Sequence, residues 1–394
     1  MAKLVEITGK AFSGEWGTDD IEGTGVPVLR TTNFSNEGII HYENVVTRKI
    51  SKKNIEEKYL QCGDIIIEKS GGSDKQPVGR VVFFDGPEHE FLFNNFTGLL
   101  RIRDKEKWEP RYVFYSLFAN YRKGGTKAYE NKTTGLHNLK IDDYISKYEV
   151  KDISVEEQKD ICKKLDLIRE VIKSQEQQIM EFDTLINSRF VEMFGDPVQN
   201  PKGWIRKPFL DMGNCKNGMN FHYVDSGVKI HCLGVGNFKD LSYIDDVKKL
   251  PMVSLNEMPS EEYLLKDGDI VFVRSNGNKS LVGRSLVVYP SDVVTTFSGF
   301  CIRYRKTDDA ISTPYLLRVL KTDSMRQKMI GRGANIQNLN QQILSTLEIP
   351  APPIELQEEF AIFVTQVEKL KDLANKSLIE TQRLFDSMMQ QFFS

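Results

Sequence analysis

The segment "GDIVFVRSNGNKSLVGR" at Gly268–Arg284 nearly repeats an earlier one, "GDIIIEKSGGSDKQPVGR" at Gly63–Arg80. Each copy contains a run of β-branched residues typical of a buried strand, then a glycine-rich polar turn, then an arginine. One copy would be unremarkable in a folded protein. Two copies about 200 residues apart favour duplication of a whole domain, since solenoid repeats have much shorter periods.

Further pairs of segments recur in the same order, at offsets between 199 and 201 residues. They are "FTG" at Phe96–Gly98 with "FSG" at Phe297–Gly299, "HNL" at His137–Leu139 with "QNL" at Gln337–Leu339, and "SVEEQKDI" from Ser154 with "PIELQEEF" from Pro353. The last pair aligns Gln158 with Gln357. Small drifts in offset are what loop insertions and deletions produce, so we interpret the chain as two tandem halves.

Within each half, the residue pattern changes once, from mixed strand and helix to helix alone. The first part mixes short strand-like runs and turns with one helical stretch, which predicts an α+β domain with a curved or barrel-like sheet. The second part is helical. We therefore predict α+β domains at residues 1–150 and 198–350, and helical segments at residues 151–197 and 351–394.

The two helical segments carry apolar residues at steps of three, four and seven, which is typical of a coiled coil. The first helix begins at the capping box of Ser154 and Glu157 and ends before Gly195 and Pro197. A helix of about 38 residues would span roughly 57 Å. We predict that the two helices pair with each other as a spacer; the alternative is that each packs on its own domain. The predicted contact residues for partners are Ile168, Ile179, Phe182, Val367, Leu378 and Leu384.

Composition and missing motifs limit the classes of protein to which the chain can belong. The chain has a net charge of −2 and five scattered cysteines, which predicts a reduced, cytoplasmic protein without a disulfide framework or zinc site. No apolar run is long enough to cross a membrane. Motifs for nucleotide phosphates, acyl hydrolysis and zinc catalysis are missing, and the acidic Glu68 is replaced by Val273 in the second copy. We expect no catalysis; Asp64 and Asp269 are interpreted as turn residues.

The repeated glycine-rich turns and a second polar loop in each half are candidates for nucleic-acid contact. Small residues allow backbone N–H groups to approach phosphates, while Arg, Asn and Gln can reach base edges. An ordinary hairpin turn or solvated loop is the alternative. The predicted DNA contacts are Lys69, Ser70, Arg80, Lys127, Lys132 and His137 in the first half, and Arg274, Ser275, Asn276, Lys279, Arg284, Arg332, Asn335 and Gln337 in the second.

These paired motifs, over essentially the whole chain, resemble the specificity subunit of type I restriction–modification enzymes. The resemblance implies two target recognition domains, each reading half of a split double-stranded DNA site, and two helices packed as an antiparallel coiled coil that sets the gap. It also implies docking of two methyltransferase (modification) subunits and of motor-nuclease (restriction) subunits. No cofactor is expected on this chain; S-adenosylmethionine and ATP would be bound by those partners. The first junction, "VKDISVEEQ", lacks the prolines of "PAPPIELQ".

Three other functions fit parts of the sequence. A protein-interaction scaffold would use the helices without contacting DNA. A self-contained DNA-modifying enzyme would need catalytic motifs that the sequence does not show. A stand-alone fragment could modulate another restriction system, and genes for a methyltransferase and a motor would then not lie beside it.

Overall fold

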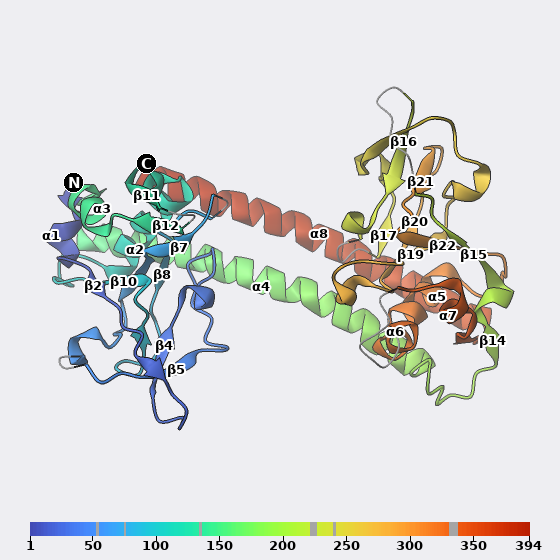
Figure 1. The fold of residues 1–394 in the computed structure, drawn as a ribbon, viewed down its shortest axis with the longest axis horizontal. Coiled ribbons are helices and arrows are strands. Elements are labelled where there is room, and N and C mark those ends of the chain that lie inside the picture. Colours follow the sequence, from blue (N-terminus) through green and yellow to red (C-terminus); the bar gives the residue numbers. More distant parts are fainter. Residues whose placement is uncertain (53–54, 75, 134–135, 221–226, 239–241, 331–337) are drawn as a thin grey trace. The chain divides into compact units, whose positions relative to one another are not determined.

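The computed structural model describes the whole chain except residues 53–54, 75, 134–135, 221–226, 239–241 and 331–337. The chain forms two compact units (Figure 1): unit 1 comprises Met1–Glu176 and Lys376–Ser394, and unit 2 comprises Gln177–Asn375. Two long helices, α4 (Val155–Phe194) and α8 (Ile354–Phe393), each contribute one segment to unit 1 and one to unit 2. Each unit is therefore an α+β body completed by two helical segments.

Unit 1 is built on antiparallel strands in the order β2 (Phe12–Ser13), β10 (Thr97–Leu100), β6 (Ile65–Glu68) and β8 (Val81–Phe83). A second sheet contains β3 (Thr18–Asp19), β5 (Val46–Lys49), β4 (Val26–Leu29) and β9 (Leu92–Phe93), in that order. A third contains β11 (Glu130–Thr133), β12 (Leu136–Leu139) and β7 (Ser70–Gly72). The last pairs β1 (Ala2–Lys3) with β13 (Glu149–Val150). The shorter helices are α1 (Leu4–Thr8), α2 (Pro110–Arg122) and α3 (Ile141–Lys147).

Unit 2 repeats this plan. Its main sheet runs β15 (Gly213–Asn217), β22 (Cys301–Lys306), β19 (Asp269–Val273), β20 (Ser285–Val288) and β17 (Tyr243–Ile244). The others are β18 (Met252–Leu255), β16 (Val228–Leu233) and β21 (Thr295–Phe297), and β14 (Arg206–Pro208) with β23 (Glu348–Pro350). The shorter helices are α5 (Thr313–Lys321), α6 (Asp323–Ile330) and α7 (Gln341–Ser345). Both units contain one corresponding parallel pair, β4 with β9 and β16 with β21, so the predicted duplication is confirmed.

The strand that opens each repeated segment contains a continuous apolar run, residues 65–67 in β6 and 270–273 in β19, because both of its faces are covered. In β6, Ile65 and Ile67 join a core with α2 and the long helices, while Ile66 packs in a second core with Val82 and Leu99. Successive side chains of a strand point to opposite faces, so a strand buried on both sides reads as a continuous apolar run.

Strand register corrects one predicted pairing. Thr97 faces Glu68 across β10 and β6, and Cys301 faces Val273 across β22 and β19. Since Glu68 and Val273 are equivalent, their strand partners Thr97 and Cys301 are equivalent too. The residues that precede these partners, Phe96 and Phe300, therefore also correspond. The pairing of "FTG" with "FSG" was therefore wrong by three residues.

A buried glutamine fixes the start of each long helix. The Gln158 side chain donates to the carbonyls of Lys107 (3.1 Å) and Ile153 (3.0 Å) and accepts from the Glu109 N–H (2.9 Å). Gln357 makes the same three kinds of contact, with Ala310 (3.0 Å), Pro352 (2.8 Å) and Ser312 (2.8 Å). Because Glu109 and Ser312 are the N-caps of α2 and α5, each glutamine joins a long helix to its α+β body.

Candidate nucleic-acid interface

The repeated turn has the same backbone frame in both units. The Lys69 N–H donates to the Phe96 carbonyl (2.8 Å), and the Lys69 carbonyl accepts from the Leu139 N–H (2.7 Å). In unit 2 the Arg274 N–H donates to the Phe300 carbonyl (2.8 Å), and the Arg274 carbonyl accepts from Leu339 (2.8 Å). Lys69 and Arg274 are therefore equivalent, and each bonds to a leucine, Leu139 or Leu339, from the second repeated segment of its unit.

The side chains at these positions differ between the units. The Lys69 ammonium donates to the Ser13 hydroxyl (3.1 Å), and burial lowers the pKa of Lys69 from its ordinary value. Ser70 donates to the Asn138 side-chain oxygen (2.6 Å). In unit 2 the Arg274 guanidinium donates to the Gly299 carbonyl (3.3 Å), and Asn276 accepts from the Asn278 N–H (2.7 Å). The shared frame thus carries different hydrogen-bonding groups in the two units.

Arg80 and His137 lie inside unit 1. Arg80 is 8% exposed, and its guanidinium donates to Glu68 (3.2 Å) and to the carbonyls of Phe34 (2.8 Å) and Thr31 (2.9 Å). His137 is also buried, with its Nδ1 2.9 Å from Glu130. Both side chains hold the loops in place from within, so the structure gives these two predicted contacts an internal role.

The remaining predicted contacts fall into three groups. Lys127 is exposed in the turn that follows α2, and Ser275 is half-buried at its bridge to Asn338. Arg284 lines a cavity of about 530 Å³ in unit 2. Arg332, Asn335 and Gln337 lie outside the described residues, as do the side chains of Lys132 and Lys279.

The turn aspartates are structural, as the sequence indicated. Asp64 accepts from the Gln61 N–H (2.8 Å) and forms an ion pair with Arg101 (2.7 Å). Asp269 accepts from the Lys266 N–H (2.7 Å) and pairs with Arg305 at the same distance. Among the described residues, no group of three or more His, Cys, Asp or Glu could hold a metal ion.

The long helices contact each other within each unit. In unit 1 the Gln175 amide donates to the Ser377 hydroxyl (2.9 Å). In unit 2, Lys371 pairs with Asp183 (2.6 Å) and Arg189 with Glu359 (2.9 Å). Residue numbers rise along α4 as they fall along α8, so the two segments of unit 2 are antiparallel. This arrangement agrees with the predicted coiled coil.

The apolar residues exposed on these helices are mostly not those predicted to bind partners. Val367 is buried, Ile168 and Phe182 pack against the cores of their units, and Ile179 and Leu378 are half-buried, whereas Leu384 is exposed. The exposed apolar residues that the sequence analysis missed are Leu167, Val171 and Ile379 in unit 1, and Met180, Leu185, Val191, Ile362, Leu370 and Leu373 in unit 2. Apart from Leu384, the predicted residues are buried or half-buried, while the missed ones are exposed on the same helices.

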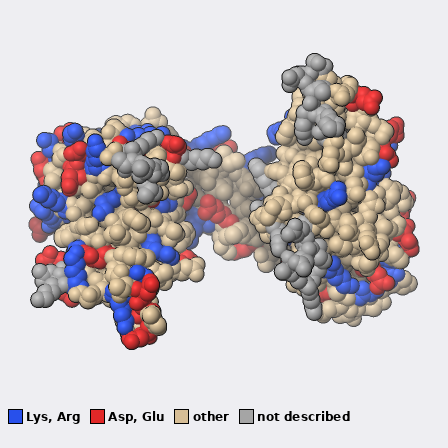
Figure 2. Space-filling model, viewed as in Figure 1, with Lys and Arg blue, Asp and Glu red and all other residues tan. Residues whose placement is uncertain are grey.

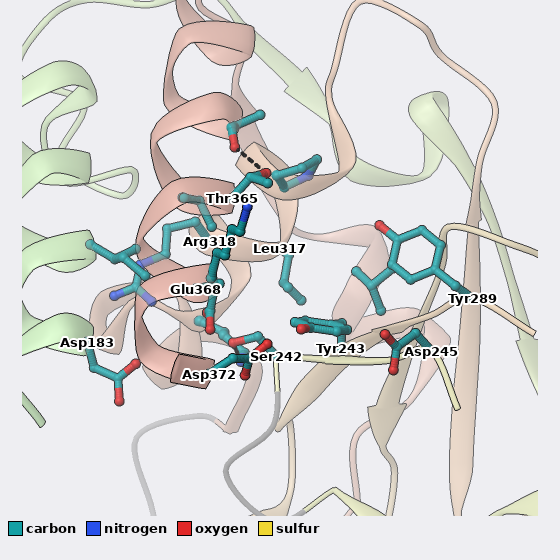
Figure 3. Close-up of a pocket in the computed structure, with 17 residues that line it drawn as sticks. Asp183, Ser242, Tyr243, Asp245, Tyr289, Leu317, Arg318, Thr365, Glu368 and Asp372 are labelled. Carbon is teal, nitrogen blue, oxygen red and sulfur yellow. Dashed lines mark hydrogen bonds between the residues drawn. The ribbon is translucent and has the colours of Figure 1, made fainter. Parts of the chain in front are cut away.

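Unit 2 contains a cavity of about 410 Å³ between α8, α5, Tyr243 of β17 and Tyr289, which follows β20 (Figure 3). Arg318, Glu368 and Lys321 line it, and the Lys321 ammonium donates to the Ser242 hydroxyl (3.0 Å). Burial lowers the pKa of Lys321 to about 8 and raises the pKa of the Glu368 carboxyl. In unit 1 the positions equivalent to Leu317, Arg318 and Lys321 are Phe114, Tyr115 and Phe118, which are buried.

The face of the molecule drawn in Figure 2 carries both basic and acidic side chains on each unit. The net charge of the chain is −2. In the part of the chain that the structure describes, no helix is both long and apolar enough to span a membrane.

Two related α+β units, each with a polar turn held in the same backbone frame and each completed by segments of two shared helices, define a duplicated recognition subunit. The chain belongs to the family of type I restriction modification DNA specificity domains, whose family model matches residues 2–181 and 244–383. It is thus a specificity subunit, the non-catalytic component of a type I restriction enzyme.

Curated relatives support this family assignment, and solved structures share the fold. The type I restriction enzyme StySPI specificity subunit of Salmonella potsdam is 23% identical over 417 residues, covering 98% of this chain and 86% of that protein. The EcoKI specificity subunit of Escherichia coli (strain K12) is 21% identical over 430 residues, with the same coverage. The fold resembles a chain from a structure of the type I R-M system (TM-score 0.60, 14% identity, 100% and 96% coverage) and the S subunit from M. genitalium (TM-score 0.54, 14% identity, 100% and 95% coverage).

Proposed function

We propose that this specificity subunit recognises a split, asymmetric double-stranded DNA site, with one half-site read by each unit. The observation that carries this proposal is the repeated frame in which Lys69 and Arg274 are held by equivalent backbone hydrogen bonds. Equal frames place loops in equivalent positions, while the different side chains on them would select different bases.

The subunit would dock methyltransferase subunits, and a motor-nuclease subunit, through the exposed apolar residues of α4 and α8. Exposed apolar residues that recur along both helices are typical of a surface that a partner protein covers. S-adenosylmethionine and ATP would be bound by those partners. Since the net charge is close to zero, partner subunits would also supply many of the phosphate contacts.

The test is to co-express the tagged chain with the neighbouring genes, purify it, identify the partners by mass spectrometry and map methylation in the host DNA. We expect a co-purified methyltransferase and a new split methylation motif that disappears when this chain is omitted. Recovery of the chain alone, with an unchanged methylation map, would contradict the proposal.

A further inference from the structure

Phe96 and Phe300 occupy equivalent positions and are both strongly exposed, at 50% and 59% of their surface. A single exposed apolar residue needs no explanation, because such residues are common on protein surfaces. Here, however, the same bulky aromatic side chain is exposed at the same position of two units whose surrounding loops have different sequences. The exposure is therefore a shared feature of the duplicated design.

A rigid turn presents each phenylalanine. In unit 1 the Thr97 N–H donates to the Asn94 carbonyl (3.1 Å), which makes Phe96 the third residue of a tight turn. In unit 2 the Cys301 N–H donates to the Ser298 carbonyl (2.9 Å), which makes Phe300 the third residue of an equivalent turn. Side chains reinforce both turns: the Thr97 hydroxyl donates to the Asn94 carbonyl (2.8 Å), and the Ser298 hydroxyl accepts from the Phe300 N–H (3.1 Å).

The carbonyl of each phenylalanine is held as well. The Phe96 carbonyl accepts the N–H groups of Lys69 (2.8 Å) and Ser70 (3.2 Å), and the Phe300 carbonyl accepts those of Arg274 (2.8 Å) and Ser275 (3.3 Å). The aromatic ring is thus tied directly to the position that carries the predicted DNA-contacting cation.

Glycines permit this arrangement. A Cβ atom on Gly14 would lie 2.0 Å from the Asn94 carbonyl oxygen, and one on Gly218 would lie 2.1 Å from that of Ser298. A backbone carbonyl cannot move far enough to relieve such close contacts. Both units therefore need a glycine at the end of the strand beside the phenylalanine turn, which is β2 in unit 1 and β15 in unit 2. The turn, its support and its exposed ring are duplicated together.

We propose that Phe96 and Phe300 are apolar wedges that insert between stacked base pairs, one at each half-site. This inference rests on the proposed function. A phenyl ring has no donor or acceptor and cannot read the hydrogen-bonding pattern of base edges. An identical ring in both units therefore fits a step that is common to both half-sites. Apolar side chains inserted at a base step unstack it, and an enzyme that modifies a base must take that base out of the stack. The wedges would assist this step for the partner methyltransferase.

The experiment uses the full chain purified with its methyltransferase partners, and duplexes carrying the mapped split site with 2-aminopurine beside the methylated base of one half-site or the other. The wild-type complex should raise the fluorescence at both half-sites. Phe96→Ala should abolish most of the rise at one half-site and Phe300→Ala at the other, each with about a tenfold loss of methylation there, which is the order of one base–aromatic contact. Phe→Trp variants should retain the signal.

Ile21→Ala and Ile205→Ala are matched controls, since these exposed apolar residues lie away from the phenylalanine turns in sequence, one in each unit. Alanine variants that melt like the wild type yet leave fluorescence and methylation unchanged at both half-sites would overturn the wedge while leaving the proposed function intact. An equal loss at both half-sites from either single variant would also overturn it. A wild-type complex that did not bind the split site would overturn the proposed function, and the wedge with it.

Discussion

At the scale of single residues, the buried polar side chains carry the most specific information. Gln158 and Gln357 are completely buried, and each satisfies one backbone N–H and two carbonyls at a junction between a long helix and an α+β body. Removing such a side chain leaves buried partners unsatisfied, which costs more than the net gain of the hydrogen bonds themselves.

Gln357→Ala should therefore destabilise unit 2 by about 2–4 kcal/mol. Urea unfolding of the wild type and the variant, followed by tryptophan fluorescence and circular dichroism, measures the difference. Gln366→Ala, at an exposed position of the same helix, is the control and should be neutral. Equal stabilities for all three proteins would contradict the role assigned to Gln357.

Lys321 makes stability depend on pH. Burial lowers its pKa to about 8 from an ordinary 10.5, so between these values the unfolded chain binds more protons than the folded one. Stability contributed by this group therefore rises as the pH increases from about 8 towards 10.5, by roughly 1–3 kcal/mol in total. Urea titrations at pH 7, 8 and 9.5 should show this rise in the wild type and in the exposed control Lys328→Met, and show less of it in Lys321→Met.

The sequence predicted the residue roles unevenly. It correctly indicated the turn aspartates and the equivalence of the two glutamines, because short-range turn and helix patterns determine both. It did not predict that Arg80 points inward, because that depends on Glu68 and on two carbonyls that approach only in the folded state. Phe96 was missed because strand register, and not local similarity, pairs it with Phe300.

At the scale of elements, each long helix has an inward seam and exposed apolar positions. Periodicity predicted most of the seam, with Leu384 as an exception, and the polar residues Gln175 and Arg189 form bonds between the helices. The exposed positions share the same helical spacing, so sequence alone could not separate a face that meets the other helix from one that meets a partner.

Leu370→Asp should reduce the amount of methyltransferase that co-purifies by about tenfold, since interface truncations and charges at anchor positions commonly have effects of this size. Leu370 is 52% exposed, so the melting temperature of the isolated chain should stay unchanged. Gln366→Asp places the same charge at an exposed polar position and is the control. Full partner recovery with Leu370→Asp would exclude this residue from the docking surface.

Lengthening both helices tests the proposed spacer. Inserting seven residues after Gln175 in α4 and seven before Ser377 in α8 keeps the apolar repeat in register. The added length is about 10 Å, or about three base pairs of DNA. Methylation mapping should then show the same half-sites with a gap longer by about that amount. An unchanged gap would contradict a spacer role, and insertion in α4 alone should mainly destabilise the pair.

At the scale of the whole molecule, one frame occurs twice with different side chains. The two tandem α+β bodies and their helices were predictable because duplication repeats every local pattern, so weak signals reinforce each other. The bounds of the units were less accessible, because both units share both helices and the division falls inside them.

Replacing Lys69 or Arg274 by Ala should weaken recognition of one half-site while sparing the other, because each cation belongs to a different unit. Competition binding of the assembled complex to duplexes altered in one half-site measures this separation, and a loss of roughly 1–3 kcal/mol would indicate a base contact. A uniform loss with a reduced salt dependence would instead assign the side chain to a phosphate.

The division of the chain also has a consequence for biosynthesis. Unit 2 is one continuous stretch, whereas unit 1 takes Phe385 and Met389 into its core from residues translated after unit 2 is complete. During translation, all residues of unit 2 are synthesised before the last residues of unit 1. Until those last residues are made, the first 176 residues keep part of their apolar surface uncovered. A premature stop after Asn375 would thus damage the domain that was synthesised first.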